Sequence, residues 1–419
     1  MKYVMLIGGI ADMGGGQKYC ANKVTELRKR GVETIVISML PGRVLLEQLK
    51  IYENNVVIEL RYPPRYYSKK QIQHILSKIE FITKKLTNDT VIDCSMPALA
   101  EWGELISHKY QCKNICFFID EKYHTTTESI KFLDFKLNRS ELYGTSIDII
   151  PMIFEQYKYI EKKKELVFNP WCTNVVENIE YSFPENFDNS RVNVAFFGRL
   201  DKSYIKDSMV LSREFFLKHN RDQFNVFLIG GTDSIYRLDE LVKLYSNLDN
   251  VATYVTGFMT PIPRKLLKSM DVCIATAGCA RVADDEKIPT ICVNTISGDP
   301  FGIIGYHIDK NSCDIRYGIN DNVTMLGLLD DIIYMKYCEK NEPKYVYDVD
   351  NIEEEMIKEI DSEFMKINKN TIKEYYDVQN IKVVGKEEII SRIIIRLLGV
   401  NVLNKFIYDI WQKIKVNWR

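Results

Sequence analysis

The strongest constraint on the fold is a series of short apolar runs, each closed by glycine or polar residues. In the second half of the chain such runs occupy residues 192–197, 224–231, 250–258 and 269–278. Helical patterns separate them, at residues 209–217, 235–244 and 262–270. Continuous apolar runs are typical of strands buried on both faces. Strands that alternate with helices predict an α/β fold with a parallel sheet.

The first half repeats this pattern. Apolar runs at residues 2–7, 33–38, 56–60, 90–95, 114–120 and 146–153 predict strands, with helices at 17–30, at about 71–86 and at 98–106. A chain of 419 residues is long for one core, so we expect two domains. Polar residues 186–191 follow Pro184 and predict the linker. We therefore expect domains at residues 1–185 and 190–385, with C-terminal helices at 386–419 that cross back to the first domain.

Composition excludes several classes of protein. The formal net charge of −1 gives no support to a nucleic-acid partner. No apolar run approaches the roughly 20 residues of a membrane-spanning helix. The N-terminus reads as a first strand rather than a signal peptide. Ten cysteines are scattered without a second pair near Cys112 and Cys116, so we expect reduced thiols, no metal site and a cytoplasmic protein.

A glycine loop follows the first predicted strand. Residues 8–19 read GGIADMGGGQKY, which contains no G-x-G-x-x-G, and Gln17 stands where a P-loop would need lysine. Without a Cβ, Gly15 and Gly16 allow a ligand to approach the backbone closely. The alternative is a tight turn that packs the following helix on its strand.

A glycine and two cations follow the first strand of the second half. Gly198 closes this strand, Arg199 comes next, and Lys206 lies just before the helical pattern. Backbone N–H groups at such a turn, with a guanidinium and an ammonium, can bind a diphosphate. The alternative is an ordinary strand-to-helix turn with charges on its surface.

The order and spacing of these elements resemble B-fold glycosyltransferases, especially the family-4-type enzymes. In that family an arginine after a glycine and a lysine some residues later bind the donor diphosphate. Arg199 and Lys206 match them, with a loop two residues longer here. The glycine triplet resembles the family's glycine loop. Gly231 and Phe258 end the next two strands of the donor domain, and the resemblance implies that they bind the donor. The resemblance implies two Rossmann-like domains whose parallel sheets face a central cleft.

The sequence departs from the family where donor-sugar contacts are expected. Family-4-type enzymes usually carry two glutamates seven residues apart, but residues 276–294 contain no such pair in register. The usual ribose glutamate would fall near Arg281 or Val282. Gly278 and Arg281 could instead contact the diphosphate, and Glu286 the ribose or sugar. Residues 284–286 could equally be a solvated helix face, so the anomeric outcome stays open.

Candidate catalytic residues follow another strand of the first half. Asp120 and Glu121 stand at the carboxyl end of the run at 114–120, the edge where open α/β sheets bind ligands. A carboxylate there, or His124, could accept the proton of an acceptor hydroxyl as a general base. The alternative for these acids is helix capping.

Two basic segments are compatible with an anionic membrane surface. Residues 61–70 place cations around three tyrosines beside an amphipathic helix, and residues 405–419 combine lysines with two tryptophans. The alternative is a solvated helix face.

The leading hypothesis is a hexosyltransferase-like glycosyltransferase of cell-surface polysaccharide or glycan assembly, at the cytoplasmic face of the membrane. The resemblance implies a nucleotide-diphosphate sugar as donor, a saccharide or lipid-linked saccharide as acceptor, and no metal or cofactor. One alternative is a non-catalytic B-fold subunit that steadies a partner glycosyltransferase, which the missing glutamate pair favours. Another is a nucleotide-sugar 2-epimerase, which would convert donor without an acceptor.

Overall fold

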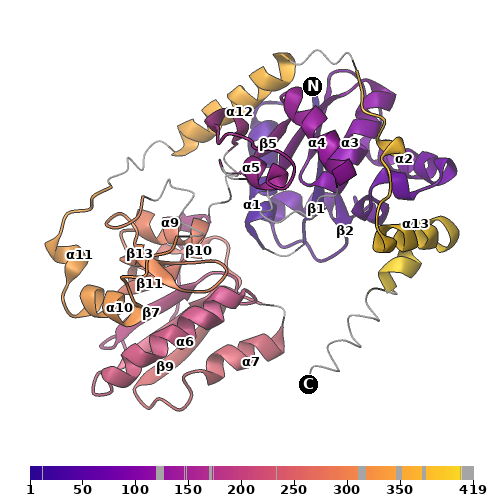
Figure 1. Cartoon of the computed structure of the whole chain (residues 1–419). Coiled ribbons are helices and arrows are strands. Elements are labelled where there is room, and N and C mark those ends of the chain that lie inside the picture. The colour runs from indigo at the N-terminus through magenta and orange to yellow at the C-terminus, as the bar shows by residue number, and fades with distance from the viewer. Residues whose placement is uncertain are drawn as a thin grey trace. The chain divides into compact units, whose positions relative to one another are not determined.

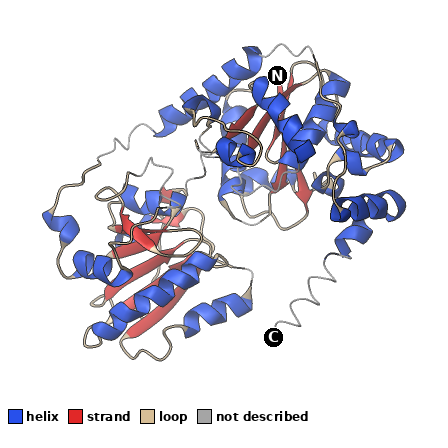
Figure 2. Cartoon of the chain, in the orientation of Figure 1, coloured by secondary structure: helices blue, strands red, loops and turns tan. Residues whose placement is uncertain are grey.

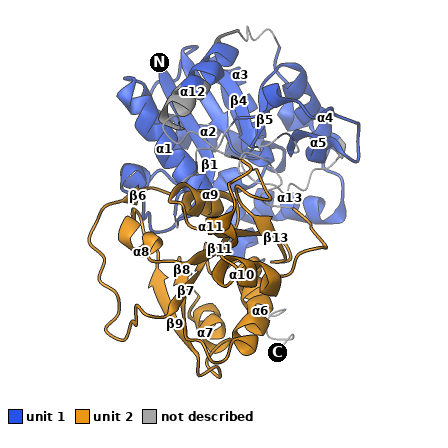
Figure 3. Cartoon of the chain, turned by 90° about the vertical axis from the view of Figure 1, so that its left-hand side faces the viewer, with its two compact units in different colours: residues 1–171, 353–419 blue, residues 172–352 orange. Residues whose placement is uncertain are grey.

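The protein consists of two compact units, residues 1–171 with 353–419 and residues 172–352 (Figure 3). The predicted boundaries differ from these: the second unit begins before residue 190, and the chain returns to the first unit before residue 386. In the computed structural model the described residues are 1–11, 13–118, 127–145, 147, 149–168, 172, 174–232, 234–309, 318–345, 352–369, 374–405 and 407. The predicted α/β class with parallel sheets is confirmed in both units (Figure 2).

The first unit is built on a sheet whose described strands pair in the order β2-β1-β3-β4-β5, all parallel. These strands are β1 (Lys2–Gly9), β2 (Glu33–Leu40), β3 (Thr90–Cys94), β4 (Lys113–Phe118) and β5 (Leu142–Gly144). The strand order reverses between β1 and β3, so the ends of these two strands flank a switch point of the sheet.

Helices cover both faces of this sheet (Figure 1). They are α1 (Gly15–Lys29), α2 (Lys69–Thr83), α3 (Pro97–Tyr110), α4 (Thr127–Asn138), α5 (Ile149–Phe154), α12 (Ile352–Lys369) and α13 (Lys386–Leu398). Short 3-10 helices are η1 (Glu47–Tyr52), η2 (Ile58–Arg61), η3 (Pro64–Tyr66), η4 (Lys164–Leu166) and η7 (Val378–Asn380). Val4 and Leu6 belong to one core with residues of α2, α3 and α13. Tyr3 points to the other face and contacts Glu363 of α12.

Two predicted strands of the first half are wrong. Residues 56–60 make only an isolated bridge between Ser38 and Val56 before turning into η2. Residues 146–153 contain the start of α5, in which Ile149, Ile150, Ile153 and Phe154 are buried. This spacing is the period of a helix, and Pro151 is tolerated because it lies in the first turn, where the missing N–H has no partner to lose.

The C-terminal return is fixed to the first unit by buried ion pairs, of which the first lies under α12. Lys23 of α1 contacts Asp93 of β3 at 3.0 Å and Glu363 of α12 at 2.8 Å. All three side chains are buried. Burial alone would lower the pKa of Lys23, but the charges of Asp93 and Glu363 raise it above its usual value. The ammonium therefore stays charged inside the unit.

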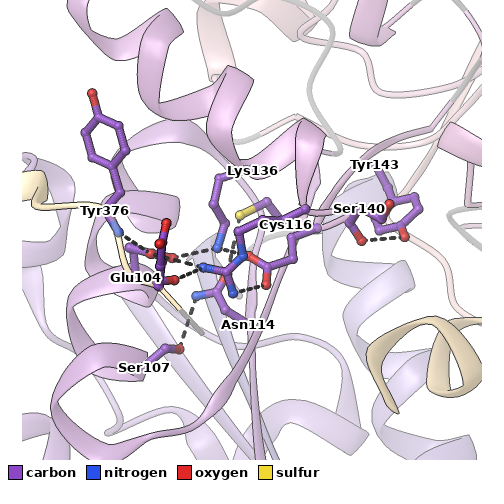
Figure 4. Close-up of polar contacts among 11 residues, drawn as sticks. Glu104, Ser107, Asn114, Cys116, Lys136, Ser140, Tyr143 and Tyr376 are labelled. Carbon is purple, nitrogen blue, oxygen red and sulfur yellow. Dashed lines mark hydrogen bonds and ion pairs between the residues drawn. The ribbon is translucent and has the colours of Figure 1, made fainter. Parts of the chain in front are cut away.

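A second buried group holds the segment before η7 (Figure 4). Lys136 of α4 is fully buried between Glu104, at 2.7 Å, and Glu141. The other oxygen of Glu104 accepts the backbone N–H of Tyr376 at 2.8 Å. Arg139 donates to the carbonyl of Glu374 at 2.6 Å. A carboxylate and a guanidinium of the first half thus bind the backbone of residues 374–376.

The third buried group holds α13. Arg65 of η3 pairs with buried Glu101 of α3 and, at 3.2 Å, with Glu388 of α13. Tyr66 donates to Glu388 at 2.9 Å. Burial raises the pKa of Glu101 to about 7, although the charge of Arg65 acts in the opposite direction. Because the charge of Arg65 does not fully compensate for burial, the protonation of the Glu101 carboxyl group changes near neutral pH.

The second unit contains a larger sheet, with described strands in the order β13-β12-β11-β7-β8-β9. Its strands are β7 (Val192–Phe197), β8 (Phe224–Ile229), β9 (Val251–Gly257), β11 (Val272–Ala275), β12 (Thr290–Val293) and β13 (Pro300–Ile303). All neighbours are parallel except β12 and β13. A separate two-stranded sheet pairs β6 (Val176–Glu177) with β10 (Ile262–Pro263).

The helices of this unit are α6 (Ser203–Lys218), α7 (Ile235–Lys243), α8 (Arg264–Lys268), α9 (Ala277–Asp285), α10 (Met325–Ile333) and α11 (Tyr337–Lys340). Val194 and Phe196 of β7 belong to one core with α6, α7 and α10. Ala195 and Phe197 belong to another, with α8 and α9. One expectation needs correction: the helix predicted at 262–270 begins as β10, and α8 follows it.

Candidate functional site

The candidate site lies at the carboxyl edge of the second sheet, between β7 and β11. β7 is the first strand of this sheet along the chain; β8 and β9 add on one side of it, and β11 and β12 on the other. Phe197 and Ala275 are paired, so both strands end at the same level. Ligands of open α/β sheets bind at such a reversal of strand order. The loops that carry Gly198 with Arg199, and Thr276 with Gly278, therefore meet at one switch point.

Three glycines pack the strand ends so closely that a side chain is excluded. A Cβ on Gly230 would lie 1.9 Å from the carbonyl oxygen of Gly198, and a Cβ on Gly231 would lie 2.5 Å from the ring of Phe258. The backbone is joined as well: Gly198 donates to Ile229 at 3.0 Å. Gly231, Gly198 and Phe258, all predicted donor-binding residues, thus form one packed edge.

Arg199 and Lys206 each have a carboxylate partner on the surface. The guanidinium of Arg199 makes two hydrogen bonds to Asp201, at 3.0 and 2.7 Å. The ammonium of Lys206 lies 2.5 Å from Glu240 of α7. The side chains of both cations remain 36% and 38% exposed, respectively. An anion at this edge could therefore reach either cation, in competition with the carboxylate.

Arg237 of α7 clamps the loop between β7 and α6. Its Nε donates to the carbonyl of Leu200 at 3.1 Å and its Nη2 to the carbonyl of Lys202 at 3.0 Å. Its Nη1 donates to Glu240 at 2.6 Å, the same carboxylate that holds Lys206. Hydrogen bonds from Lys206 and Arg237 lower the pKa of Glu240. Arg237 thereby fixes both the loop that carries Arg199 and the partner of Lys206.

Tyr204 lies beneath this loop and is buried. A Cβ on Gly198 would lie 2.5 Å from its hydroxyl oxygen. Burial raises the pKa of Tyr204 above its usual range, the charges of Cys279 and Asp201 add to the rise, and Arg199 opposes it. The phenol is thus close to both α9 and the loop, and it stays protonated.

The first turn of α9 faces the same edge. Its N-cap is Thr276, and Ala277 has a φ of +49°, which costs a non-glycine residue ~1–3 kcal/mol. Among the described residues, a Cβ added to Gly278 would meet only the carbonyl oxygen of Cys172, at 3.8 Å. N–H groups of a first helical turn lack intrahelical partners and attract anions. The small residues leave space for an anion to approach them.

Arg281 and Glu286 occupy different parts of α9. Arg281 is half-buried one turn into the helix, and its charge acts against the rise that burial and Asp284 cause in the pKa of Cys292. Glu286 caps the opposite end of the helix from Gly278 and accepts two hydrogen bonds from Arg264, at 3.0 and 3.1 Å. Its carboxylate has a partner within the unit, and its contact with a sugar stays a prediction.

Gly15 and Gly16 begin α1 in the first unit, and residues 10–14 separate them from the end of β1. Gln17 accepts the N–H of Gly14 at 3.1 Å and donates to the carbonyl of Gly9 at 2.9 Å, so it caps the helix. Gly15 is exposed and Gly16 half-buried. The predicted catalytic residues Asp120, Glu121 and His124 lie outside the described residues. Among the residues that are described, no group of three His, Cys, Asp or Glu side chains is arranged to hold a metal.

Searches for related proteins give matches among solved structures. A glycosyltransferase from Rickettsia africae superposes with a TM-score of 0.52 and 13% identity, over 88% of this chain and 93% of that one. The pneumococcal O-GlcNAc transferase GtfA, in complex with UDP and GlcNAc, superposes with a TM-score of 0.51 and 10% identity, over 88% and 99%. Both superpositions span the two units. The chain has the glycosyltransferase B fold.

Other comparisons add little to the B-fold assignment. A protein from Listeria monocytogenes that is provisionally assigned as a UDP-N-acetylglucosamine 2-epimerase reaches a TM-score of 0.45 at 11% identity, over 87% and 97% of the two chains. That score is too low to bear on function. No family model and no curated protein matches the chain.

Sequence reasoning found the loop residues of this B-fold unit but missed those that hold them. Gly198, Arg199 and Gly278 follow the ends of strands. A glycine or an arginine at such a position can be recognised from the sequence. Arg237 and Glu240 lie within a helix and look like an ordinary surface pair spaced i, i+3. The sequence gives one signal for Arg237 and Glu240, which is that they lie on α7. This helix follows β8, and β8 is the neighbour of β7, the strand that precedes the loop they hold.

Proposed function

We propose that the protein is a glycosyltransferase, which transfers a sugar from a nucleotide-diphosphate sugar to an acceptor hydroxyl. One observation carries the proposal: the strand order β13-β12-β11-β7-β8-β9 brings the Gly198-Arg199 turn and the first turn of α9 to one switch point. A guanidinium and a helix N-terminus together suit a diphosphate. The B fold adds that proteins of this architecture include glycosyltransferases.

In this proposal the protein stabilises the leaving nucleoside diphosphate. Negative charge grows on the diphosphate as the sugar–oxygen bond breaks, so fixed donors at that position lower the barrier. Arg199 supplies a charged hydrogen bond, worth ~1.5–3 kcal/mol. Each 1.36 kcal/mol realised in the transition state gives about tenfold in rate. Arg237 and Glu240 need not touch the donor, because they act by holding the loop and Lys206.

The finer parts of the proposal concern the substrates. We propose hexosyl transfer to a saccharide or lipid-linked saccharide at the cytoplasmic face of the cell membrane, with Asp120, Glu121 or His124 as the general base. We also propose that transfer needs no metal or cofactor, because cations of the chain take the place of a metal at the diphosphate. Turnover should then persist in excess chelator, and a strict requirement for Mn²⁺ or Mg²⁺ would count against this site.

A ligand screen with a matched pair of variants tests the proposal. UDP is the first ligand to try, since the GtfA structure contains it, followed by GDP, ADP and CMP. A ligand that binds only the folded protein raises its melting temperature. Arg199→Ala should abolish that shift and lower turnover at least about tenfold. Arg191→Ala is the control, because Arg191 stands at the other end of β7 and also pairs with an aspartate, Asp188. Equal effects of the two variants would refute the proposal.

A second candidate function is a non-catalytic B-fold subunit. Residues Arg281 and Val282 stand near the place of the usual ribose glutamate, which is the observation that favours it. This candidate predicts that a nucleotide can raise the melting temperature while no sugar is transferred. A 2-epimerase would instead convert the donor alone, so product analysis without an acceptor separates it from a transferase.

A further inference from the structure

Helix α13 of the first unit carries its apolar side chains outward. Ile390, Ile393 and Leu397 are spaced i, i+3 and i+7 and are 52%, 51% and 77% exposed. This spacing places them on one helix face. Ile389 and Leu398 flank them and are also exposed. Large aliphatic side chains that gather on a surface mark a site of interaction.

The inward side of α13 is held by polar contacts and by the packing of Ile394 and Ile395 against the core. Glu388 binds Arg65 and Tyr66, as described above. Gln71 of α2 donates to the carbonyl of Ile395 at 2.9 Å, and Ile395 is fully buried. Arg396 donates to the backbone carbonyls of Tyr66 and Tyr67 at 3.3 and 3.2 Å. The orientation of the helix is therefore fixed by specific bonds, and the aliphatic face is left outward.

Cations lie on and beside α13. Lys386 and Arg392 belong to α13 itself, whereas Arg396 is bound inward to the carbonyls of Tyr66 and Tyr67. Lys69 and Lys70 are exposed in the first turn of α2, next to Gln71, which binds α13. Arg61 contacts Asn404, just beyond the helix, at 3.3 Å. On α13 the acids are Glu387 and Glu388, of which Glu388 is paired inward.

We propose that the outward face of α13, with the cations around it, docks onto an anionic phospholipid bilayer. This proposal deepens the proposed function, because it names the surface that would bring the enzyme to a lipid-linked acceptor. The reason for docking rests on the proposed function, whereas the docking itself does not. Aliphatic side chains ringed by lysine and arginine are typical of helices that lie in the membrane interface. No helix in the described parts of the chain is long and apolar enough to span a membrane.

Vesicle co-sedimentation of the full chain tests the proposal. Vesicles of phosphatidylglycerol and phosphatidylcholine are compared with vesicles of phosphatidylcholine alone, without any nucleotide-sugar. Wild type should bind the anionic vesicles, and added salt should weaken binding. Ile390→Gln/Leu397→Gln should weaken it at least about tenfold, because it removes two exposed aliphatic side chains that would be buried in the bilayer. Lys69→Gln/Lys70→Gln should weaken it by roughly fivefold for each cation.

The matched control replaces exposed apolar residues elsewhere in the same unit. Ile51 and Phe81 are 67% and 88% exposed, so Ile51→Gln/Phe81→Gln should leave vesicle binding unchanged. Circular dichroism and melting temperature check that all variants fold. Equal binding of wild type and Ile390→Gln/Leu397→Gln, or equal binding to neutral vesicles, overturns the proposal. So does a wild-type dimer that this variant converts to monomer, because the face would then bind a second copy. UDP binding, measured without vesicles, reports on the proposed function separately.

Discussion

Arg237 offers a sharp test of the site, because it holds the loop without contacting the place where a diphosphate would bind. Arg237→Ala removes hydrogen bonds to the carbonyls of Leu200 and Lys202 and to Glu240. The loop then keeps its hydrogen bond from Leu200 to Gly231 at 3.1 Å but loses both side-chain contacts from α7. Lys206 keeps its partner Glu240, but that carboxylate loses its second hydrogen-bond donor.

The expected size of the effect follows from these bonds. Charged hydrogen bonds contribute ~1.5–3 kcal/mol each, so the two carbonyl bonds together hold the loop by about 3 kcal/mol at the lower bound. If the loop must be in this position in the transition state, the loss appears in kcat as about 100-fold. Arg237→Lys should recover part of this, since one ammonium can replace only some contacts of a planar guanidinium.

The assay is steady-state donor turnover with the melting temperature measured on the same samples. Arg213→Ala is the control: Arg213 of α6 also bonds a carbonyl, that of Leu244 at 2.6 Å, and Asn247 at 3.0 Å. It should lower stability to a similar extent without lowering kcat. If Arg237→Ala and Arg213→Ala have the same kcat per folded molecule, the loop does not need its clamp and the reasoning fails.

Three further predictions concern stability and donor binding. Because the folded-state pKa of Glu101 is raised to about 7, its stabilising contribution is fully present below about pH 4.5 and is lost as pH rises through 7. Urea unfolding should show a loss on the order of 3 kcal/mol over this range, which Glu101→Gln should flatten; an unchanged slope would contradict the shift. Glu363→Gln should cost about 1.5–3 kcal/mol, because it replaces a charged acceptor of Lys23 while Asp93 remains as its ion-pair partner, whereas Asp361→Asn on the exposed side of α12 should cost at most about 1 kcal/mol. Gly278→Ala should preserve the melting temperature, since the one described neighbour of the added Cβ is the carbonyl oxygen of Cys172 at 3.8 Å, an ordinary contact, but it should weaken UDP binding; unaltered affinity would exclude a phosphate at α9.

Much of the sheet architecture could be predicted from sequence because the strands are buried on both faces. Runs such as residues 192–197 are apolar except for Asn193, and parallel strands of this kind are recognisable without partners. β5 could not be recognised, since it has only three residues, Leu142–Gly144. The residues themselves do not predict the strand order, nor that Arg199 and Gly278 meet at one edge of the sheet. Only the resemblance implied both. Nothing local in the chain specifies that β11 pairs with β7.

The burial of these charged residues could not be predicted from the sequence, for a different reason. Glu363 and Glu388 lie in segments rich in Lys and Glu, which normally indicate a solvated helix face. Each is held by a cation more than 300 positions earlier, Lys23 and Arg65, and such distant pairs leave no local pattern. This is also why the return to the first unit was predicted at residue 386, later than the structure has it.

The interrupted layout of the first unit has a consequence for biosynthesis. A ribosome completes residues 1–171, and then all of residues 172–352, before it makes the helix that carries Glu363. Until then Lys23 has only Asp93, and Arg65 only Glu101, as acidic partners from this network. The nascent N-terminal part therefore lacks these second hydrogen-bond acceptors while the intervening unit is translated and folds. A chain released early would leave buried N–H groups of Lys23 and Arg65 without acceptors, and such a less stable chain is degraded by the cell's quality-control proteases.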